Sequence, residues 1–540
     1  MMKSPFVVFI GLREYDNLGI GYMSGILENN GFRTRVIDIN KKKSEISRII
    51  RKLDPLLVGF SVIYLHNLNK FKDLMGSLRQ EGIDCHFTAG GHYASLKHEE
   101  LFGLIPALDS IVRFEGEYTT LELLKCISED SDLRNIKGLA FRYRNKVEIN
   151  PLRPFEKDLD NFPFPRRSVL KTYAFWKKCA TIIAGRGCTH NCSFCNTRKF
   201  YSQMPGKVRR IRRPEMVVKE MEMLYRKRNC EIFLFLDDDF PLKSVGGEDW
   251  ITKFCNELQK TGLSGKILWK INCRPDEVDE KLFALMKSHG LFNVFLGIED
   301  GTDSGLKRMN KKMTAEDGMR AVEILKKLKI RLDFGFLLFQ PQTTFLSLNE
   351  NLNFLGKICG DGYAPVTFLK MMPFYETRIE KELIKVGRLN VSPEMNDYDF
   401  LEESMNYYYN YINDCFWDWL KAADGLENTA SWAGNYIAVY LHYFDVQPYA
   451  RAQIRRVRKI VSESNLFLIG TMKEMATYFE YNKQYGNDKL FLESYRESIK
   501  EHHEYYRSLI INTMARLISF AQDYTIRAYL QSLGNDAVSH

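Results

Sequence analysis

The chain has 540 residues, of which 45% are hydrophobic and 27% charged, and it carries a formal net charge of +9. Its length predicts about three or four domains, and its ordinary composition excludes a mainly disordered, collagen-like or coiled-coil chain. No run of about 18 uncharged apolar residues occurs, and the N-terminus is more typical of a first strand than of a signal peptide, so we expect a cytoplasmic protein without a membrane span. The mild charge does not predict a nucleic-acid partner.

Residues 1–150 alternate strand-like and helix-like segments. Such alternation predicts an α/β domain with a doubly wound parallel sheet, of the Rossmann or flavodoxin-like kind. Residues 151–176 contain four prolines and are interpreted as a linker. The expected strands are Phe6–Gly11, Arg35–Ile39, Leu56–Val62, Cys85–Ala89 and Ser110–Arg113, with a helix over Leu18–Asn30.

A second α/β series occupies residues 177–385. Six strand–helix units are too few for a complete eight-stranded barrel and predict an open, partial (β/α)6 barrel of the TIM type, with its chemistry at the C-terminal ends of the strands. The basic run from Lys207 to Arg213 is expected to be a solvated loop. The expected strands are Ala180–Gly185, Ile232–Leu236, Ile267–Asn272, Asn293–Gly297, Leu332–Leu338 and Val366–Met371, with helices over Pro214–Lys227 and Ala315–Lys327.

The strand pattern stops near residue 386, and residues 386–540 are predicted to form a mostly helical domain. Its densest aromatic patch extends from Tyr407 to Trp419 and is expected to be mainly core. We hypothesise that this domain caps the mouth of the barrel.

Three of the eleven cysteines lie close together, in the glycine-rich loop that follows the strand Ala180–Gly185. Cys188, Cys192 and Cys195 have the spacing C-x₃-C-x₂-C, which lets three thiolates converge on one metal centre. A 4Fe–4S cluster with three cysteine ligands keeps one iron open for a substrate or cofactor. The alternative is a structural zinc site completed by His190 or a distant cysteine. The other eight cysteines are expected to be small buried side chains.

This loop resembles the cluster-binding loop of radical S-adenosylmethionine (radical SAM) enzymes. The resemblance implies that Cys188, Cys192 and Cys195 bind a 4Fe–4S cluster, whose fourth iron is chelated by S-adenosylmethionine. Reductive cleavage of the sulfonium would then yield a 5′-deoxyadenosyl radical that abstracts hydrogen. The same resemblance places Phe194 against the adenine side of the cofactor.

Three further strand ends agree with this family. Asp238 follows the second expected barrel strand, Arg274 the third, and Glu299 lies in Gly297-Ile298-Glu299-Asp300-Gly301 at the end of the fourth. That stretch resembles the family's Gly-Ile-Glu-Ser-Gly, with Asp300 in place of serine. By resemblance, Asp238, Arg274 and Glu299 are cofactor contacts, while the alternative is that each is a capping or ion-paired barrel residue.

The N-terminal domain resembles the cobalamin-binding class of this superfamily. The class motif is Asp-x-His-x-x-Gly, then Ser-x-Leu, then Gly-Gly. The chain has Asp16 to Gly21, then Ser61, then Gly90 and Gly91, with 39 residues between Gly21 and Ser61. Leu18 replaces the histidine that would bind cobalt. Cobalamin therefore binds without a histidine lower ligand, or the domain has lost it.

The motifs are compatible with three functions. The first is a cobalamin-dependent methylase that methylates an unactivated carbon of a small molecule. The second keeps the radical but performs cyclisation, dehydrogenation, epimerisation or elimination without cobalamin. The third is a metal-stabilised binding or sensor protein that does not turn over S-adenosylmethionine. Both of the first two functions require an external electron donor such as flavodoxin or ferredoxin.

Overall fold

The computed structural model describes residues 5–536 apart from 14–16, 145, 243–248, 393–394 and 483–487, with side chains described up to residue 522. Asp16 of the cobalamin motif lies outside the described residues. The chain divides into two compact units. The first unit comprises Met1–Lys171, Cys179–Glu257 and Met372–Tyr398, and the second comprises Thr172–Lys178, Leu258–Met371 and Asp399–His540.

The N-terminal part of the first unit is built on a seven-stranded sheet of order β2-β1-β3-β4-β5-β6-β7. Strands β1 to β5 are parallel, which confirms the predicted doubly wound sheet. A hairpin of β6 and β7 extends it in antiparallel pairing and was not among the expected strands. The strands are β1 Phe6–Gly11, β2 Arg33–Asp38, β3 Leu57–Ser61, β4 His86–Gly90, β5 Ser110–Val112, β6 Leu139–Tyr143 and β7 Lys146–Ile149.

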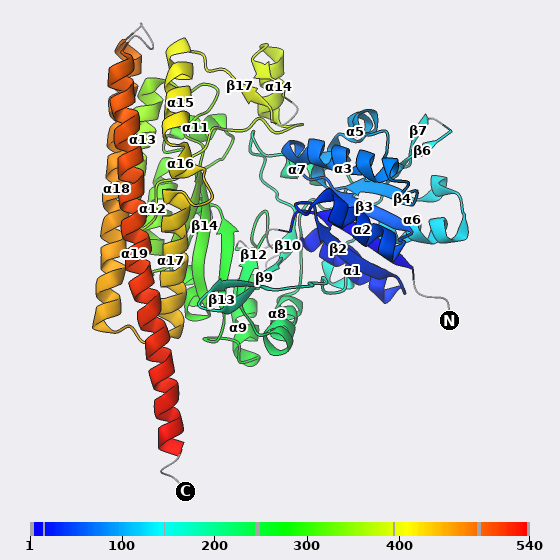
Figure 1. The fold of residues 1–540 in the computed structure, drawn as a ribbon, viewed down its shortest axis with the longest axis horizontal. Helices are drawn as coiled ribbons and strands as arrows, with labels where there is room; N and C mark the ends of the chain where they lie inside the picture. The colour runs from blue at the N-terminus through cyan, green and yellow to red at the C-terminus, as the bar shows by residue number, and fades with distance from the viewer. Residues whose placement is uncertain are drawn as a thin grey trace. The chain divides into compact units, whose positions relative to one another are not determined.

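Helices cover both faces of this sheet (Figure 1). Along β1, Val8 and Ile10 point into one core and Val7 and Phe9 into the other, as the two-residue period of a strand requires. One face is covered by α2 Lys43–Leu53, α3 Leu68–Gln80 and α5 His98–Leu104, and the other by α1 Leu18–Asn29 and α6 Glu117–Glu129. Three shorter helices are η1 Leu65–Asn67, α4 His92–Leu96 and η2 Leu133–Asn135.

The proline-rich segment after β7 is irregular, as expected, yet it is closely packed. Phe155, Leu159 and Phe162 are buried, and the short helix η3 Leu159–Asn161 lies within it. The backbone N–H of Arg166 donates to the carbonyl of Gly21 in α1 at 2.9 Å. These contacts hold the segment on α1, so it is not a free tether.

The second sheet has the order β15-β14-β13-β12-β9-β8 and forms the expected open, partial barrel. The predicted strand Val366–Met371 is not among its strands. Its second half is joined to the end of β15 by a bridge between Phe339 and Lys370 and by the N–H of Leu369, which donates to the Phe336 carbonyl at 2.8 Å. The N–H of Val366 instead donates to the side chain of Asn465 at 2.9 Å, so it is withdrawn from any ladder. The strands are β8 Lys171–Ala174, β9 Lys177–Ile182, β12 Cys230–Phe235, β13 Leu268–Cys273, β14 Leu291–Glu299 and β15 Arg331–Phe336.

Helices follow the barrel strands, as the sequence pattern predicts. Thr314 and Asp317 form a capping box at the start of α12, which explains why this helix begins where it does. The helices are α7 Thr197–Tyr201, α8 Pro214–Arg228, α9 Trp250–Lys260, η4 Pro275–Glu277, α10 Glu280–Ser288, α11 Asp303–Arg308, α12 Ala315–Lys327, α13 Phe345–Cys359 and α14 Arg378–Lys385. Two short hairpins are β10 Gly185–Arg186 with β11 Arg210–Ile211, and β16 Leu389–Asn390 with β17 Asp397–Tyr398.

The C-terminal part of the second unit is helical, and its long helices α18 and α19 run side by side (Figure 1). The aromatic patch is divided: Tyr408, Phe416 and Trp419 are buried, whereas Tyr407 is 44% and Trp417 53% exposed. The five helices are α15 Glu403–Cys415, α16 Trp417–Leu420, α17 Leu426–Tyr443, α18 Pro448–Tyr481 and α19 Lys489–Asp536.

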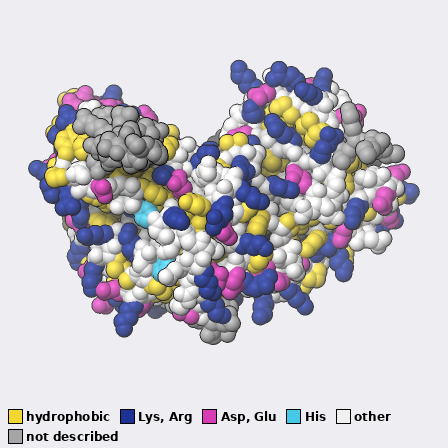
Figure 2. Space-filling view, turned by 90° about the horizontal axis from the view of Figure 1, so that it is seen from below, with side chains coloured by type: hydrophobic (Ala, Val, Ile, Leu, Met, Phe, Trp, Pro, Cys, Tyr) yellow, Lys and Arg dark blue, Asp and Glu magenta, His cyan; other side chains and the backbone are white. Residues whose placement is uncertain are grey.

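None of the described helices is long and apolar enough to cross a membrane. On the face shown in Figure 2, Lys and Arg side chains are dispersed among acidic and apolar ones. This dispersal agrees with the mild net charge of the sequence.

Candidate active site

The cysteine loop begins directly after β9, and a buried carboxylate holds its first residues. Asp237, which follows β12, accepts the backbone N–H groups of Ala184 at 3.0 Å and of Gly185 at 2.6 Å. Burial raises the pKa of Asp237 to about 7, and these two hydrogen bonds oppose that rise. These hydrogen bonds attach the end of β12 to the beginning of the cysteine loop after β9.

Gly187 lets the loop turn into the cysteines. Its φ is +83°, and a Cβ atom at this position would lie 2.0 Å from the carbonyl oxygen of Val208. No side chain fits there, so glycine is required by both backbone conformation and space. The chain can therefore pass from the hairpin β10–β11 directly to Cys188.

The three cysteines lie in irregular backbone rather than in a helix or strand. Cys188 and Cys192 are half-buried, and Cys195 is exposed. Burial and the charge of Asp239 raise the pKa of the Cys188 thiol to about 12. Phe194, half-buried, lies in the turn between Cys192 and Cys195. The three thiols are thus carried by an irregular loop that turns at Gly187.

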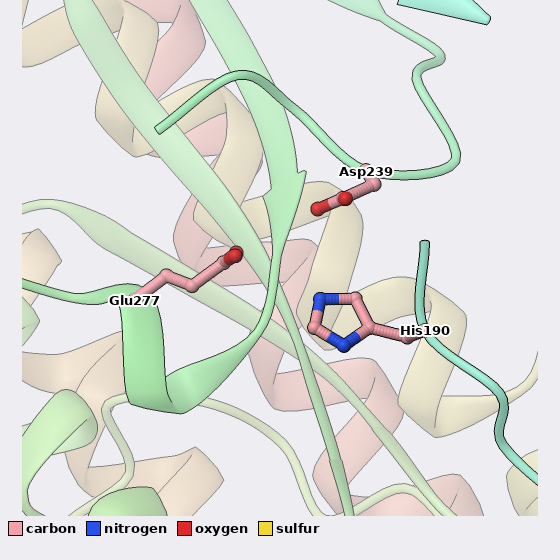
Figure 3. Close-up of side chains that lie close together, drawn as sticks. All are labelled: His190, Asp239 and Glu277. Carbon is pink, nitrogen blue, oxygen red and sulfur yellow. The ribbon is translucent and has the colours of Figure 1, made fainter. Parts of the chain in front are cut away.

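Two polar side chains of the first unit, His190 in this loop and Asp239 after β12, lie close together. A ring nitrogen of His190 and a carboxylate oxygen of Asp239 lie within 4.8 Å of each other (Figure 3). Asp239 also pairs with the guanidinium of Arg209, whose second nitrogen donates to the Asp239 carbonyl at 2.7 Å. Glu277, the third residue labelled in Figure 3, belongs to η4 of the second unit.

A cavity of about 280 Å³ opens in the first unit at the C-terminal edge of its parallel sheet. Ser61, Gly90 and Gly91, the residues predicted to bind cobalamin, all line it. Asp238, predicted to contact S-adenosylmethionine, lines the same cavity. Burial raises the pKa of Asp238 to about 6, and a hydrogen bond from the Gly187 backbone opposes that rise. The structure therefore brings together residues that the sequence assigned to two cofactors.

The cavity lies where the strand order reverses, between β1 and β3, which is the usual ligand position in doubly wound sheets. Leu18, at the start of α1, contributes an apolar wall. The side chain of Asn17 caps α1 by accepting the Ile20 N–H at 3.1 Å, and its amide nitrogen lies 3.5 Å from the Ser61 hydroxyl.

A buried network of ion pairs borders the cavity. Arg186, which lines it two residues before Cys188, contacts Glu115 at 3.1 Å and Glu117 at 2.6 Å. Arg210 also contacts Glu115, at 2.6 Å. The charges are paired, as buried charges must be.

The structure corrects one expectation, because the basic run Lys207–Arg213 is a solvated loop only in part. Lys207 and Arg213 are exposed, whereas Arg210 and Arg212 are only 5% and 3% exposed. Arg212 contacts the fully buried Glu220 at 2.7 Å. Sequence alone showed the positive charges but not the carboxylates that face them after folding.

Arg274 and Glu299 meet around Lys311 in the second unit. The guanidinium of Arg274 donates to the carbonyl of Lys311, and the Lys311 ammonium lies 3.6 Å from Glu299. Glu299 has a φ of +69°, and burial raises its pKa. Arg274 also contacts Asp276 at 2.8 Å. Each predicted cofactor contact thus has an ion-pair partner, so the capping or ion-pair alternative remains open for both.

Sequence reasoning missed several of these residues. Lys311 carries no sequence signal. Arg186 stands two residues before the first cysteine of the motif, and Glu115 and Glu117 follow strand β5. His92 also lines the cavity and stacks on Phe200 with ring centroids 3.9 Å apart; burial lowers its pKa to about 4.

Comparison with known proteins agrees with this architecture. The family described as the radical SAM superfamily matches residues 182–344, and the B12 binding domain matches residues 12–124. An uncharacterized methyltransferase of Pyrococcus horikoshii is 26% identical over 364 residues, covering 66% of this chain and 76% of its own. The anaerobic magnesium-protoporphyrin IX monomethyl ester cyclase of Rubrivivax gelatinosus is 28% identical over 347 residues, covering 61% and 60%.

The fold is also found in a solved structure. The cobalamin-dependent S-adenosylmethionine radical enzyme OxsB, solved with aqua-cobalamin and S-adenosylmethionine, superposes with a TM-score of 0.66 at 17% identity, covering 97% of this chain and 81% of its own. The chain therefore contains a radical SAM domain and, before it, a B12 binding domain, and it shares its fold with this solved structure.

Proposed function

We propose that this protein is a cobalamin-dependent radical SAM methylase that methylates an unactivated carbon of a small molecule. The observation that carries the proposal is the cavity of about 280 Å³ lined by Ser61, Gly90, Gly91, Arg186 and Asp238. It combines the residues of the cobalamin motif with residues that flank the cysteine loop. A methylase needs its methyl donor beside its radical source, and these residues support that arrangement.

Cys188, Cys192 and Cys195 are proposed to hold the 4Fe–4S cluster. Their fit is favourable, because thiolates are the ligands of iron–sulfur clusters and three of them retain an open iron. Phe194, Asp238, Arg274 and Glu299 are proposed to bind S-adenosylmethionine. The cluster and S-adenosylmethionine supply the radical chemistry, while the protein orients the cofactors and excludes side reactions.

Cobalamin is proposed to occupy the cavity without a protein ligand on its lower face. Leu18 cannot coordinate cobalt and instead supplies an apolar contact. Gly91 has a φ of +104° and no side chain, and a Cβ atom at this position would lie 2.8 Å from the carbonyl oxygen of Val62. The exposed glycine backbone and the Ser61 hydroxyl suit a large flat ligand with a polar tail.

The domain roles follow the same proposal. Residues 1–150 would form the cobalamin-binding domain, 151–176 a linker, 177–385 the radical SAM core and 386–540 the helical domain. An external flavodoxin or ferredoxin would supply electrons in the cytoplasm.

A second function is radical chemistry without methyl transfer, such as cyclisation. The relative from Rubrivivax gelatinosus is named a cyclase, which favours keeping this alternative. Both functions begin with the same hydrogen abstraction, and only methyl transfer adds a carbon to the product.

Anaerobic purification from cells supplied with cobalamin tests both functions. About four irons per chain are expected for either one. Near-stoichiometric corrinoid on the same sample, and release of S-adenosylhomocysteine as well as 5′-deoxyadenosine, would support methylation. Iron without corrinoid would refute the methylase and favour the alternative.

A further inference from the structure

The cysteine loop of the first unit carries an excess of positive charge. From Gly187 to Arg213 the chain contains no aspartate or glutamate. At the base of the loop, carboxylates from other segments pair with the cations, which are Arg186, Arg209, Arg210, Arg212 and Arg213. These pairs compensate the charges at the base, so the excess of positive charge lies on the outer part of the loop.

Three cations on this outer part are not compensated. Arg198 and Lys207 are exposed, and Lys199 is half-buried. The guanidinium of Arg198 donates to the backbone carbonyl of Thr189, which carries no charge. Within the described part of the chain, no carboxylate forms an ion pair with any of the three. Their charges are therefore available to an external anionic partner.

The fold brings these cations to the cysteines from two directions. The pairing of β10 with β11 returns the chain to the start of the loop, where a Cβ atom on Gly187 would lie 2.0 Å from the carbonyl oxygen of Val208. Lys207, the residue before Val208, is thereby placed near the first cysteine. The hydrogen bond from Arg198 to Thr189 attaches α7 to the residue that follows this cysteine. Positive charge thus lies on both sides of the cysteine motif.

The loop has an inner and an outer side, as helix α7 shows. Phe200 and Tyr201 are buried and line the cavity of about 280 Å³ that is proposed to hold the cofactors. Arg198 and Ser202, which are four residues apart and so share the opposite face of the helix, are exposed. Cys195, two residues before α7, is exposed as well. A partner can therefore approach the cysteines from the outer side without entering the cavity.

Helix α14 adds an apolar edge beside this outer side. The backbone N–H of Ile379 donates to the carbonyl of Ser193 in the cysteine loop at 3.1 Å, so the first turn of α14 is attached to the loop. Ile384 lies five residues further, about 8 Å along the helix axis, and is 58% exposed. Val386, directly after the helix, is 62% exposed. Apolar side chains next to charged ones are typical of a protein interface.

We propose that this outer surface, defined by Cys195, Arg198, Lys199 and Lys207 with Ile384 at its edge, docks an acidic flavodoxin. Carboxylates of the partner face the uncompensated cations, and the apolar dimethylbenzene edge of its flavin suits the apolar side chains of α14. The assignment rests on the proposed radical SAM function and adds the place where its electron donor binds. In the transfer step, an anionic flavin hydroquinone gives up one electron and becomes the neutral semiquinone, and the cluster at the three cysteines accepts that electron.

A nucleic acid is a poorer match for this surface. Binding to a polyanion gains affinity with each phosphate that a cation neutralises, and three cations on one loop neutralise at most about three phosphates. A compact acidic protein needs only a few such cations for orientation and for faster association. The exposed cysteine at the centre of the surface gives an electron carrier a reason to bind there.

Binding of an acidic flavodoxin to the anaerobically purified full-length protein tests the assignment. The double variant Arg198→Gln/Lys207→Gln is expected to raise the Kd about tenfold or more at low salt, because it removes two of the three uncompensated cations. The difference from wild type should shrink as salt is added, since salt screens exposed charges. Failure of flavodoxin to bind the wild-type protein would overturn the proposal.

A matched control separates the surface from net charge. Arg456→Gln/Lys357→Gln removes the same two charges from exposed positions of α18 and α13 in the second unit and should leave the Kd within about twofold of wild type. Equal effects of the two double variants would contradict the assignment. Two further probes are an acidic ferredoxin and a single-stranded DNA of about 20 nucleotides. Tighter binding of either probe than of flavodoxin would overturn the choice of partner.

Melting temperature, iron content and dithionite-driven 5′-deoxyadenosine formation are measured on the same samples, and all three should match wild type. With limiting flavodoxin hydroquinone as the reductant, 5′-deoxyadenosine formation by Arg198→Gln/Lys207→Gln should fall about tenfold. If deoxyadenosine forms with dithionite but flavodoxin binding ignores the two cations, the docking assignment fails and the proposed function stands. If binding follows the cations but no deoxyadenosine forms with dithionite, the proposed function fails and the docking surface stands.

Discussion

Replacement of Gly91 by alanine tests the cavity of the first unit most directly. Gly91 has φ +104° and ψ −179°, a region of backbone conformation that is essentially restricted to glycine and costs about 1–3 kcal/mol for other residues. The new Cβ atom would lie 2.8 Å from the carbonyl oxygen of Val62, and overpacking of this kind costs about 1–3 kcal/mol. We therefore expect Gly91→Ala to lower the free energy of unfolding by about 2–6 kcal/mol.

The assay is thermal unfolding of the full-length protein, together with corrinoid content after anaerobic purification. At about 2–4 °C per kcal/mol, the variant should melt about 4–24 °C lower and retain less corrinoid. Gly76→Ala is the matched control, because Gly76 lies within helix α3 with nothing within 4 Å of its Cβ position. That change should raise stability by about 0.5–1 kcal/mol. Equal melting temperatures for the two variants would refute the reasoning.

Three other changes test the remaining parts of the site. Cys195→Ala should reduce iron from about four atoms per chain to below about one, because the cluster loses a ligand; undiminished iron would count against the cysteine assignment. Arg210→Gln removes one of the two guanidinium groups that contact the buried Glu115 and should lower the free energy of unfolding by about 3 kcal/mol. Denaturant unfolding measures this loss, and a loss under about 1 kcal/mol would contradict the ion-pair network. Because the pKa of Glu427 is raised from 4.5 to about 7 on folding, its contribution to stability is lost as pH rises through this range. The melting temperature of Glu427→Gln relative to wild type should therefore increase between pH 5 and pH 8, and a pH-independent difference would contradict it.

Local patterns predicted most of the elements. Strand β1 shows why: its consecutive apolar residues Val7, Val8, Phe9 and Ile10 fill cores on both faces of the sheet, and such a continuous apolar run is typical of a parallel strand. The hairpin β6–β7 was missed because an edge hairpin, half exposed, leaves a weaker apolar signal. The expected strand Val366–Met371 is reduced to a bridge in its second half, and its first amide donates to a distant residue, Asn465.

By itself, the sequence determined the chemistry that can occur: three cysteines in one loop, glycines at strand ends, and a leucine in place of a cobalt-binding histidine. These signals are local, since each depends on spacings within one segment. Tertiary structure decided which charges meet. Arg210 and Glu115 are 95 positions apart and form a buried pair, and Lys270 and Asp333 are 63 positions apart. The physical reason is that an ion pair depends on distance in space, and only the packed fold brings such distant residues together.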